Sequence, residues 1–198
     1  MGVLDGVDYD DLDGDQDTLG GYRSVLHGLR RPTLHEADSW DEADSWDEAD
    51  SWDEELDLVI EQLRTWTDVP RESVAICVPT NQMVADVIQR LGRRGIVSTE
   101  ITRDGPRSDE GVHVGTMYRF KGLEYRCMII AGVAEGLVPR SSVDVWERTD
   151  PLRHRRELQR ARSLLFVAAT RARDALAISW NGEPSRFLKP LRATDRKT

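Results

Sequence analysis

Short and almost continuous apolar runs, separated by amphipathic stretches, are the feature that most constrains the fold of this chain. Strands are predicted at residues 74–78, 97–102, 112–116, 127–131 and 175–180, and the apolar runs are most continuous at 74–78 and 127–131. Their length, their β-branched residues and the turn signals beside them are typical of strands buried on both faces of a sheet. Between the first two runs, residues 80–94 repeat apolar residues at helical spacing and stop at Gly95. Strands that alternate with helices predict an α/β fold with a parallel sheet.

Two more helices are expected at the ends of this pattern. Ser51 and Glu54 have the spacing of a capping box and precede an apolar stripe, which predicts a helix from about residue 52 to a point before Pro70. A long helix is predicted after Pro151, and its apolar residues recur at helical spacing until Ala168. The folded domain is therefore expected to span residues 51–190.

The first 50 residues have a different composition and are expected to form a disordered, acidic, low-complexity tail. Residues 1–57 carry 19 acidic and 3 basic residues, whereas the rest of the chain carries 17 acidic and 24 basic residues. Residues 37–54 are three identical copies of Ala-Asp-Ser-Trp-Asp-Glu. The copies favour a flexible spacer with exposed tryptophans, and a partner-docking or DNA-mimicking arm is the alternative. The mildly basic remainder is compatible with a polyanionic partner.

Several classes of protein are excluded by what the sequence lacks. Cys77 and Cys127 lie inside apolar runs, so we expect two buried thiols, and neither a metal cluster nor a disulfide framework. No apolar run is long enough to cross a bilayer, and the acidic start is unlike a secretory leader, so a cytoplasmic location is expected. The three lysines are Lys121, Lys189 and Lys197, and none follows a glycine. The sequence therefore contains no phosphate-binding P-loop, which requires Gly-Lys-Ser/Thr.

Residues 114–125 form the first of two stretches that could carry chemistry. A predicted strand ends at Thr116, and Lys121-Gly122 follows in a polar loop. Ligand contacts gather at the carboxyl ends of parallel strands, so these residues could hold a phosphate oxygen there. The alternative is that Lys-Gly after a strand has no function and that Glu124 is a surface residue.

Residues 157–174 form the second stretch, in which an apolar helix continues directly into Thr170-Arg171 and then into a strand. A helix with alanines facing the core would pack closely against the sheet and so fix the position of Arg171 at its end. From the edge of the sheet its guanidinium could reach a nucleotide bound to a neighbouring domain and stabilise charge on a transferring phosphoryl group. The alternative is that Arg171 and Arg173 only solvate the helix end and complement its dipole.

Together the two stretches resemble the C-terminal RecA-like domain of superfamily one DNA helicases of the UvrD/Rep/PcrA type. Residues 116–125, Thr-Met-Tyr-Arg-Phe-Lys-Gly-Leu-Glu-Tyr, are similar to motif V of that family, Thr-x-His-x-x-Lys-Gly-Leu-Glu-aromatic. Residues 167–173, Val-Ala-Ala-Thr-Arg-Ala-Arg, are similar to motif VI, and residues 135–139 resemble the Glu-Gly-x-x-Pro segment that lies between the motifs. The resemblance covers roughly residues 52–185, and it implies a RecA-like parallel sheet flanked by helices, the P-loop NTPase-like fold of a second motor domain.

The resemblance also implies residue roles. Arg171 would be the arginine finger that contacts the γ-phosphate, and Glu124 would lie at the ribose. The nucleotide-binding residues that it implies are Gly122, Glu124, Thr170 and Arg171. The residues that it implies for DNA binding and coupling are Thr116, Tyr118 and Lys121. Tyr118 stands where the family usually has His, and Phe166 stands where it usually has Tyr.

The implied function is ATP-dependent movement along single-stranded DNA. ATP and Mg²⁺ would be bound mainly by a first RecA-like domain that carries the P-loop, on this or a separate chain. Because these 198 residues contain no P-loop, no ATPase activity is expected from them alone. Two alternatives stay open, a non-catalytic RecA-like module that binds DNA or a repair partner, and a truncated remnant.

Overall fold

The computed structural model describes residues 8–10, 16–18, 33–37 and 48–189. The chain divides into two units, residues 1–29 with 188–198, and residues 30–187. In the first unit, β1 (Asp8–Asp10) and β2 (Gln16–Thr18) form an antiparallel pair. The disorder predicted for residues 1–50 and the first two hexapeptide copies fall largely outside the described residues.

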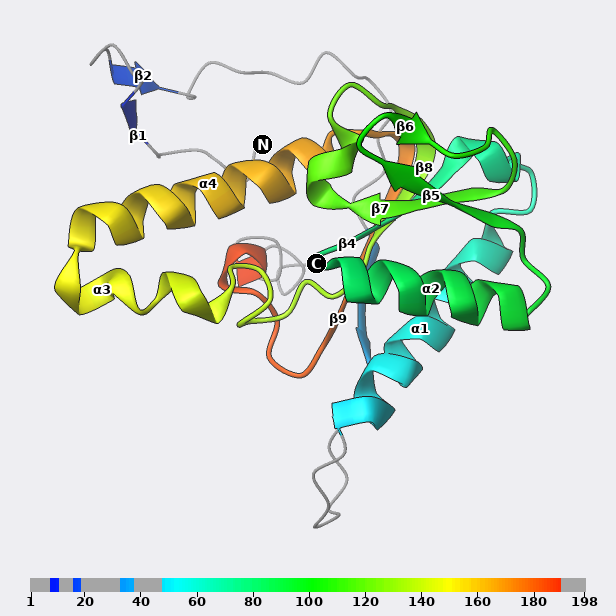
Figure 1. Cartoon of the computed structure of the whole chain (residues 1–198), viewed down its shortest axis with the longest axis horizontal. Helices are drawn as coiled ribbons and strands as arrows, with labels where there is room; N and C mark the ends of the chain where they lie inside the picture. Colours follow the sequence, from blue (N-terminus) through cyan, green and yellow to red (C-terminus); the bar gives the residue numbers. More distant parts are fainter. Residues whose placement is uncertain (1–7, 11–15, 19–32, 38–47, 190–198) are drawn as a thin grey trace, which may run out of the picture. The chain divides into compact units, whose positions relative to one another are not determined.

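The second unit is built on a seven-stranded sheet with the order β3-β9-β8-β4-β7-β5-β6 (Figure 1). Its strands are β3 (Thr33–Ala37), β4 (Val74–Val78), β5 (Ser98–Thr102), β6 (Gly105–Pro106), β7 (Val112–Thr116), β8 (Tyr125–Ile130) and β9 (Ala172–Asn181). Neighbouring strands are parallel except for the short β5–β6 hairpin. The predicted α/β fold with a parallel sheet is confirmed.

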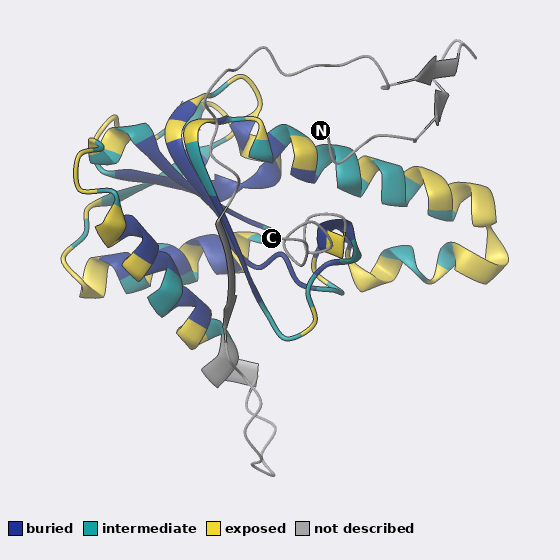
Figure 2. Cartoon of the chain, turned by 180° about the vertical axis from the view of Figure 1, so that it is seen from behind, coloured by how far each residue is buried: buried dark blue, intermediate teal, exposed yellow. Residues whose placement is uncertain are grey.

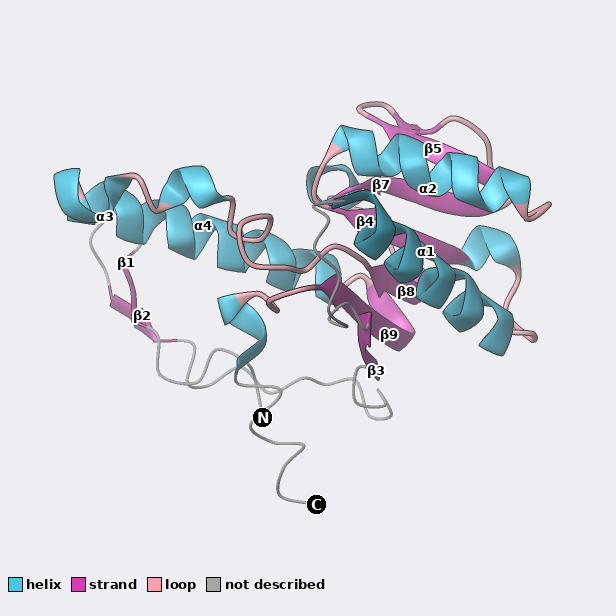
Figure 3. Cartoon of the chain, turned by 90° about the horizontal axis from the view of Figure 1, so that it is seen from below, coloured by secondary structure: helices cyan, strands magenta, loops and turns pink. Residues whose placement is uncertain are grey.

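Helices cover the two faces of the sheet. The helices are α1 (Glu48–Thr65), α2 (Asn81–Arg93), α3 (Trp146–Thr149) and α4 (Pro151–Ala169), with 3₁₀ turns η2 (Arg71–Ser73), η3 (Met117–Phe120), η4 (Ser141–Val143) and η5 (Arg186–Leu188). The α1 and α2 helices pack on one face, and η3 and α4 pack on the other, as expected for right-handed crossovers that run in opposite directions along the sheet (Figure 3). No helix in these described ranges has the length and apolar character needed to span a membrane.

The central strands are buried on both faces. Every residue of β4 and β7 is buried, as expected for central strands of a sheet that is covered on both faces (Figure 2). A core cluster joins α1 and α2 to the sheet, through residues such as Leu63, Ile76 and Leu91. A residue of the third repeat also holds α1 in place, because the Trp52 indole donates a hydrogen bond to Asp86 of α2 at 3.3 Å. The third hexapeptide copy is therefore part of the folded unit.

The α4 helix continues beyond the sheet. Asp150 caps its first turn by accepting a hydrogen bond from the Arg153 backbone at 3.0 Å, and Pro151 occupies the first turn. Its buried residues, Leu165 and Ala168, lie near its carboxyl end. The first half of the helix is largely exposed, lies beside α3 and extends away from the sheet (Figures 1 and 2).

The structure differs from the sequence-based expectation at the start of the folded unit. The β3 strand pairs with β9, although it lies before the boundary predicted at residue 51. Its sequence, Thr-Leu-His-Glu-Ala, has no apolar run, because an edge strand is held mainly through backbone hydrogen bonds on one side. The predicted capping box is wrong as a helix start, because α1 begins at Glu48 and Ser51 lies inside it.

Candidate functional site

The first candidate stretch connects β7 to β8 across one face of the sheet. Thr116 ends β7 and is only 8% exposed. The 3₁₀ turn η3 follows, and its Phe120 is fully buried, with its ring edge-on to Tyr125 at 5.8 Å between centroids. Because Phe120 anchors the turn, Tyr118 and Arg119 lie on its outer side, where Tyr118 is 68% exposed.

The loop then reaches the amino end of β8. Lys121, Gly122 and Glu124 are exposed. Gly122 has a φ of +82°, a left-handed backbone conformation that favours glycine. The turn therefore explains why a glycine follows Lys121. The loop therefore presents an ammonium group and a carboxylate to solvent from one tight turn.

Arg171 lies next to this turn, directly before the neighbouring strand β9. The Tyr125 backbone N–H donates to the Arg171 carbonyl at 2.9 Å, and the Arg171 N–H donates to Ala168 at 3.1 Å. The side chain is half-buried, and within the described residues its Nε is buried without a hydrogen-bond partner. Thr170 is exposed, and its hydroxyl donates to the Val167 carbonyl at 2.8 Å at the end of α4. The backbone of Arg171 is thus fixed at the start of β9, and within the described residues its guanidinium has no ion pair.

The predicted residues gather at two ends of the sheet. Glu124 and Arg171 precede the first residues of β8 and β9, at their amino ends, whereas Thr116 ends β7 at its carboxyl end. Of the residues expected at the carboxyl end of a strand, Thr116 lies there, whereas Lys121 and Gly122 follow η3 in the turn before the amino end of β8. The η3 turn carries the chain back across the sheet without a long helix, so the Lys-Gly turn lies at the start of the next strand.

A buried polar pair lies beneath this turn. The His113 Nδ1 and the Tyr125 hydroxyl are 2.8 Å apart, and their rings meet edge-on at 5.4 Å. Burial raises the pKa of Tyr125 to about 12. Burial also lowers the pKa of His113 below its ordinary value, although Asp109 opposes this shift. Both groups are therefore held neutral, and they fix the start of β8 next to Glu124; the sequence analysis did not single out this pair.

An ionic network holds the segment that follows β8. Arg186 binds Glu135 through its backbone N–H at 2.9 Å and through Nε at 2.7 Å, and it binds Asp144 through Nη1 at 3.0 Å and Nη2 at 2.8 Å. His154 of α4 also contacts Asp144, at 3.2 Å. Partial burial would raise the pKa of Glu135, but the bonds from Arg186 outweigh burial and lower it. Hydrogen bonds from Arg186 likewise lower the pKa of Asp144.

This network gives the Glu-Gly-Leu-Val-Pro segment a structural role that the sequence did not reveal. Glu135 begins that segment, and Arg186 lies about fifty residues later in the chain. The network ties residues 135–144 to η5 and to α4. Only the resemblance of residues 135–139 to a family segment indicated that Glu135 mattered, and nothing in the sequence indicated Arg186.

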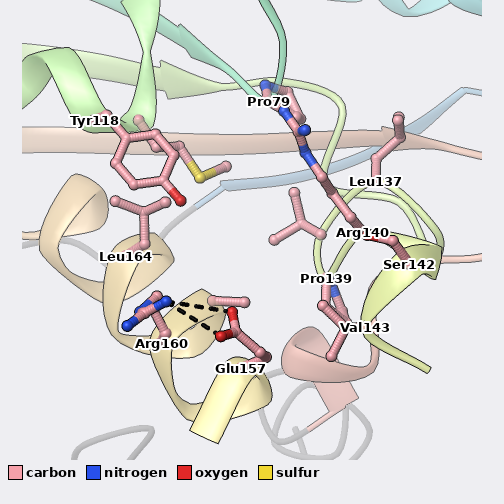
Figure 4. A pocket seen from close by; sticks show the side chains of 13 residues that line it. Pro79, Tyr118, Leu137, Pro139, Arg140, Ser142, Val143, Glu157, Arg160 and Leu164 are labelled. Atoms are coloured by element: carbon pink, nitrogen blue, oxygen red, sulfur yellow. Dashed lines mark hydrogen bonds and ion pairs between the residues drawn. The ribbon is translucent and has the colours of Figure 1, made fainter. Parts of the chain in front are cut away.

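A pocket lies at the other end of the sheet, between η3, residues 137–143 and α4 (Figure 4). Tyr118 and Leu164 line one side, and Leu137 and Arg140 line the other. Pro79, directly after β4, also contributes. Of the predicted site residues, only Tyr118 lines this pocket. Among the described residues, no group of three or more His, Cys, Asp or Glu side chains could hold a metal ion.

Comparison with known proteins identifies the family. Residues 60–183 match the family described as UvrD-like helicase C-terminal domain. The chain belongs to this family. The resemblance to UvrD-type helicases found in motifs V and VI is therefore confirmed at the level of the domain.

Curated relatives of this UvrD-like C-terminal domain are much longer proteins. The protein named "Putative ATP-dependent DNA helicase YjcD" from Bacillus subtilis (strain 168) is 35% identical over 94 residues, which cover 43% of this chain and 12% of the relative. The "ATP-dependent DNA helicase UvrD2" from Mycobacterium bovis is 31% identical over 93 residues, which cover 41% of this chain and 12% of the relative. The aligned part thus spans about an eighth of each relative's length.

A solved structure supports the fold. The crystal structure of the C-terminal domain of a possible DNA helicase from Lactobacillus plantarum WCFS1 matches with a TM-score of 0.55 and 19% identity. The match covers 81% of this chain and 80% of the solved chain. The sheet and helices of this UvrD-like domain therefore have the fold of that solved domain.

Proposed function

We propose that this domain is the second motor domain of an ATP-dependent DNA helicase and that Arg171 is its arginine finger. In this proposal, a first RecA-like domain supplies the P-loop, and the two domains together couple ATP hydrolysis to movement along single-stranded DNA. The observation that carries the proposal is that the buried Nε of Arg171 has no partner among the described residues, on a backbone bonded to Tyr125, the residue after Glu124.

The local structure of Arg171 suits a residue that senses phosphate. Its backbone is bonded on both sides, to Ala168 and to Tyr125, so its position is set by α4 and by the sheet. A buried guanidinium nitrogen without an acceptor costs free energy until an anion arrives. The oxygens of a triphosphate held by another domain would supply that acceptor, and the guanidinium would stabilise the charge that develops on the transferring phosphoryl group.

The residues near Arg171 suit contacts with the parts of a nucleotide other than its γ-phosphate. Glu124 is exposed and can accept hydrogen bonds from ribose hydroxyls, and the left-handed Gly122 leaves the backbone open to close approach. Thr170 also lies at this end and is exposed. ATP with Mg²⁺ would supply the free energy of the motor, and this chain would contribute the finger and the ribose contact.

The other loop residues are proposed to face the DNA. Tyr118 and Lys121 are exposed and border the face on which η3 lies. Thr116 is 8% exposed, so its contribution is proposed to be the placement of the loop. The η3 turn joins Tyr118, on the proposed DNA side, to the turn that carries Glu124. In this proposal, a movement of the nucleotide-binding turn would therefore reach the DNA contacts through one short segment.

The experiment reconstitutes the motor in trans. The full chain would be mixed with the separately prepared first RecA-like domain of a UvrD-like helicase, and ATP hydrolysis would be measured with and without single-stranded DNA. The chain alone should hydrolyse no ATP, and the mixture should show DNA-stimulated turnover. Arg171→Ala should lower this turnover by roughly 10³-fold or more.

Arg173→Ala is the matched control, because Arg173 is exposed two residues away and makes no ion pair with the other described residues. Its turnover should match that of the unmodified chain. Equal turnover for Arg171→Ala would show that Arg171 is not the finger. A mixture that binds DNA but never hydrolyses ATP would favour a non-catalytic module instead.

A further inference from the structure

The free end of the α3–α4 hairpin carries an exposed surface that is both apolar and cationic. This end extends away from the sheet, and the buried residues of α4, Leu165 and Ala168, lie near the opposite end of the helix (Figure 1). We call its exposed residues the arginine tip: Val145, Arg148, Leu152, Arg155 and Arg156. The two apolar members, Val145 and Leu152, are 67% and 62% exposed. Large apolar side chains this exposed beside several cations suit a surface that binds a partner.

The part of the arginine tip on α4 faces away from the pocket and from the core. Leu152, Arg155 and Arg156 are three and four residues apart, so they share one side of the helix. Ala161 lines the pocket and Leu165 is buried, and the helical period places both on roughly the opposite side. The arginine tip is therefore a surface separate from the pocket.

The charge of the arginine tip is unpaired. Arg148, Arg155 and Arg156 make no ion pair with the other described residues. Residues 145–156 carry four arginines and two acids, and one of these acids, Asp150, is used to cap α4. The first turn of α4 contains no acid, although the positive end of the helix dipole lies there and favours acids. An acidic partner would therefore be stabilised at this end of the helix.

The chain itself contains an acidic sequence of matching chemistry. Residues 37–48, the first two copies of the hexapeptide, hold six acidic residues, two tryptophans and no basic residue. The third copy shows how the same hexapeptide binds a helix. Its Trp52 packs against the core cluster and donates to Asp86, and its Asp53 pairs with Arg90 of α2 at 3.4 Å. The motif thus combines an indole with a carboxylate that pairs with arginine, and the arginine tip offers both counterparts.

The position of these copies in the chain favours the arginine tip of a second molecule. Residues 38–47 connect Ala37 of β3 to Glu48 of α1, so a segment tethered at both ends can reach only roughly 20 Å from its anchors. The α1 helix packs on the opposite face of the sheet from α4, and α1 and α3 lie on opposite sides of the view in Figure 3. A neighbouring molecule has no such tether.

We propose that the arginine tip of one molecule binds residues 37–48 of a second molecule. Trp40 and Trp46 would contact Val145 and Leu152, and the acids beside them would pair with the arginines. Single exposed ion pairs contribute little, so the contact depends on several pairs acting together with the apolar anchors. The proposal does not rest on the motor function, because it needs neither ATP nor a first RecA-like domain.

Self-association of the full chain tests the contact. Sedimentation velocity between about 1 and 200 µM protein, in about 50 mM NaCl, should show association that rises with concentration. In about 500 mM NaCl the chain should be monomeric, because salt screens exposed charges. Arg155→Glu combined with Arg156→Glu should weaken association by about tenfold or more. Arg93→Glu combined with Arg103→Glu is the charge-matched control and should change nothing, because both arginines are exposed and unpaired among the described residues outside the tip.

A charge swap and a peptide identify the occupant. Asp41→Lys combined with Asp47→Lys should weaken association, and adding both changes to the chain with the reversed tip should restore it. A fluorescent peptide with the sequence of residues 37–48 should bind the full chain in anisotropy measurements and should not bind the chain with the reversed tip. The same peptide with serine in place of both tryptophans should bind more weakly. Thermal melting would check that the tip variants fold, which is expected because the substituted residues are exposed.

Four outcomes would overturn the proposal. They are a monomer at every concentration in low salt, association that survives the reversed tip, a charge swap that restores nothing, and peptide binding by a chain that stays monomeric. The last result would place the contact within one molecule. If the reversed tip left association unchanged but weakened binding of oligo-dT, the arginine tip would be a nucleic-acid surface instead.

Discussion

Replacing the buried Glu55 should reveal how a carboxyl group inside the fold makes stability depend on pH. Glu55 lies on α1 and is 1% exposed. One oxygen, Oε1, accepts hydrogen bonds from the Gly132 backbone and from the Ser179 hydroxyl, both at 2.6 Å. The other oxygen is buried without a partner among the described residues. Burial therefore raises the pKa of Glu55, although the two hydrogen bonds partly oppose this effect.

The expected direction follows from the raised pKa. The protonated form of Glu55 is the one that the fold accommodates, so its stabilising contribution is complete below the ordinary carboxyl pKa and is lost as the pH rises through the folded pKa. Each unit by which folding raises the pKa costs about 1.4 kcal/mol once the pH exceeds the folded value. A variant without the carboxyl group should not show this loss.

Two substitutions separate charge from hydrogen bonding. Glu55→Gln keeps an acceptor for Gly132 and Ser179, so at low pH its free energy of unfolding should lie within about 1 kcal/mol of the unmodified chain. Glu55→Ala leaves both donors unpaired at roughly 1–3 kcal/mol each, so it should lose about 2–6 kcal/mol at low pH. The loss in either variant should shrink as the pH rises, because only the unmodified chain pays for a buried charge.

Urea unfolding followed by circular dichroism, at several values between about pH 4.5 and pH 8, would give these free energies. The unmodified chain should lose more stability than Glu55→Gln over this range. If the two chains lost stability in parallel, Glu55 would not be the group that responds to pH. If Glu55→Gln were as unstable as Glu55→Ala at low pH, the hydrogen bonds to Oε1 would not explain the effect.

Three further substitutions test other contacts of the fold. Arg186→Ala should cost about 1–3 kcal/mol in urea unfolding, because it leaves two partly exposed carboxylates without their counter-ion; an unchanged free energy of unfolding would mean that solvent screens the network. Tyr125→Phe should cost about 1–3 kcal/mol, because His113 Nδ1 loses its partner, and an unchanged unfolding midpoint would contradict this. Gly132→Ala should cost about 1–2 kcal/mol, because φ is +74° there and the new methyl group meets Met83; a thermal melt that matches the unmodified chain would exclude that strain.

The apolar periodicity of the sequence predicted most of the fold. The strands at 74–78 and 112–116 and the helix before Gly95 lie where the pattern placed them, because burial on both faces leaves a continuous apolar signal. The β3 strand was missed for the opposite reason, since it lies at the edge of the sheet and is held through its backbone.

The candidate site was predicted less completely. Family motifs indicated Glu124 and Arg171, and the structure brings them to neighbouring strands. Their roles in nucleotide binding stay predictions. The partners of Glu135 could not be predicted, because an arginine that bonds two carboxylates from other segments has no local sequence signal.

The sequence by itself determined the local chemistry of this domain: where strands and helices form, where a glycine permits a left-handed turn, and which motifs it shares with UvrD-like helicases. Only the tertiary structure decided which distant groups meet. It placed the start of β8 against Arg171, left the Nε of that arginine without an acceptor among the described residues, and built a pocket between Tyr118 and Arg140. The physical reason is that periodicity reports burial along one element, whereas contacts between elements depend on strand order, which the sheet fixes as a whole.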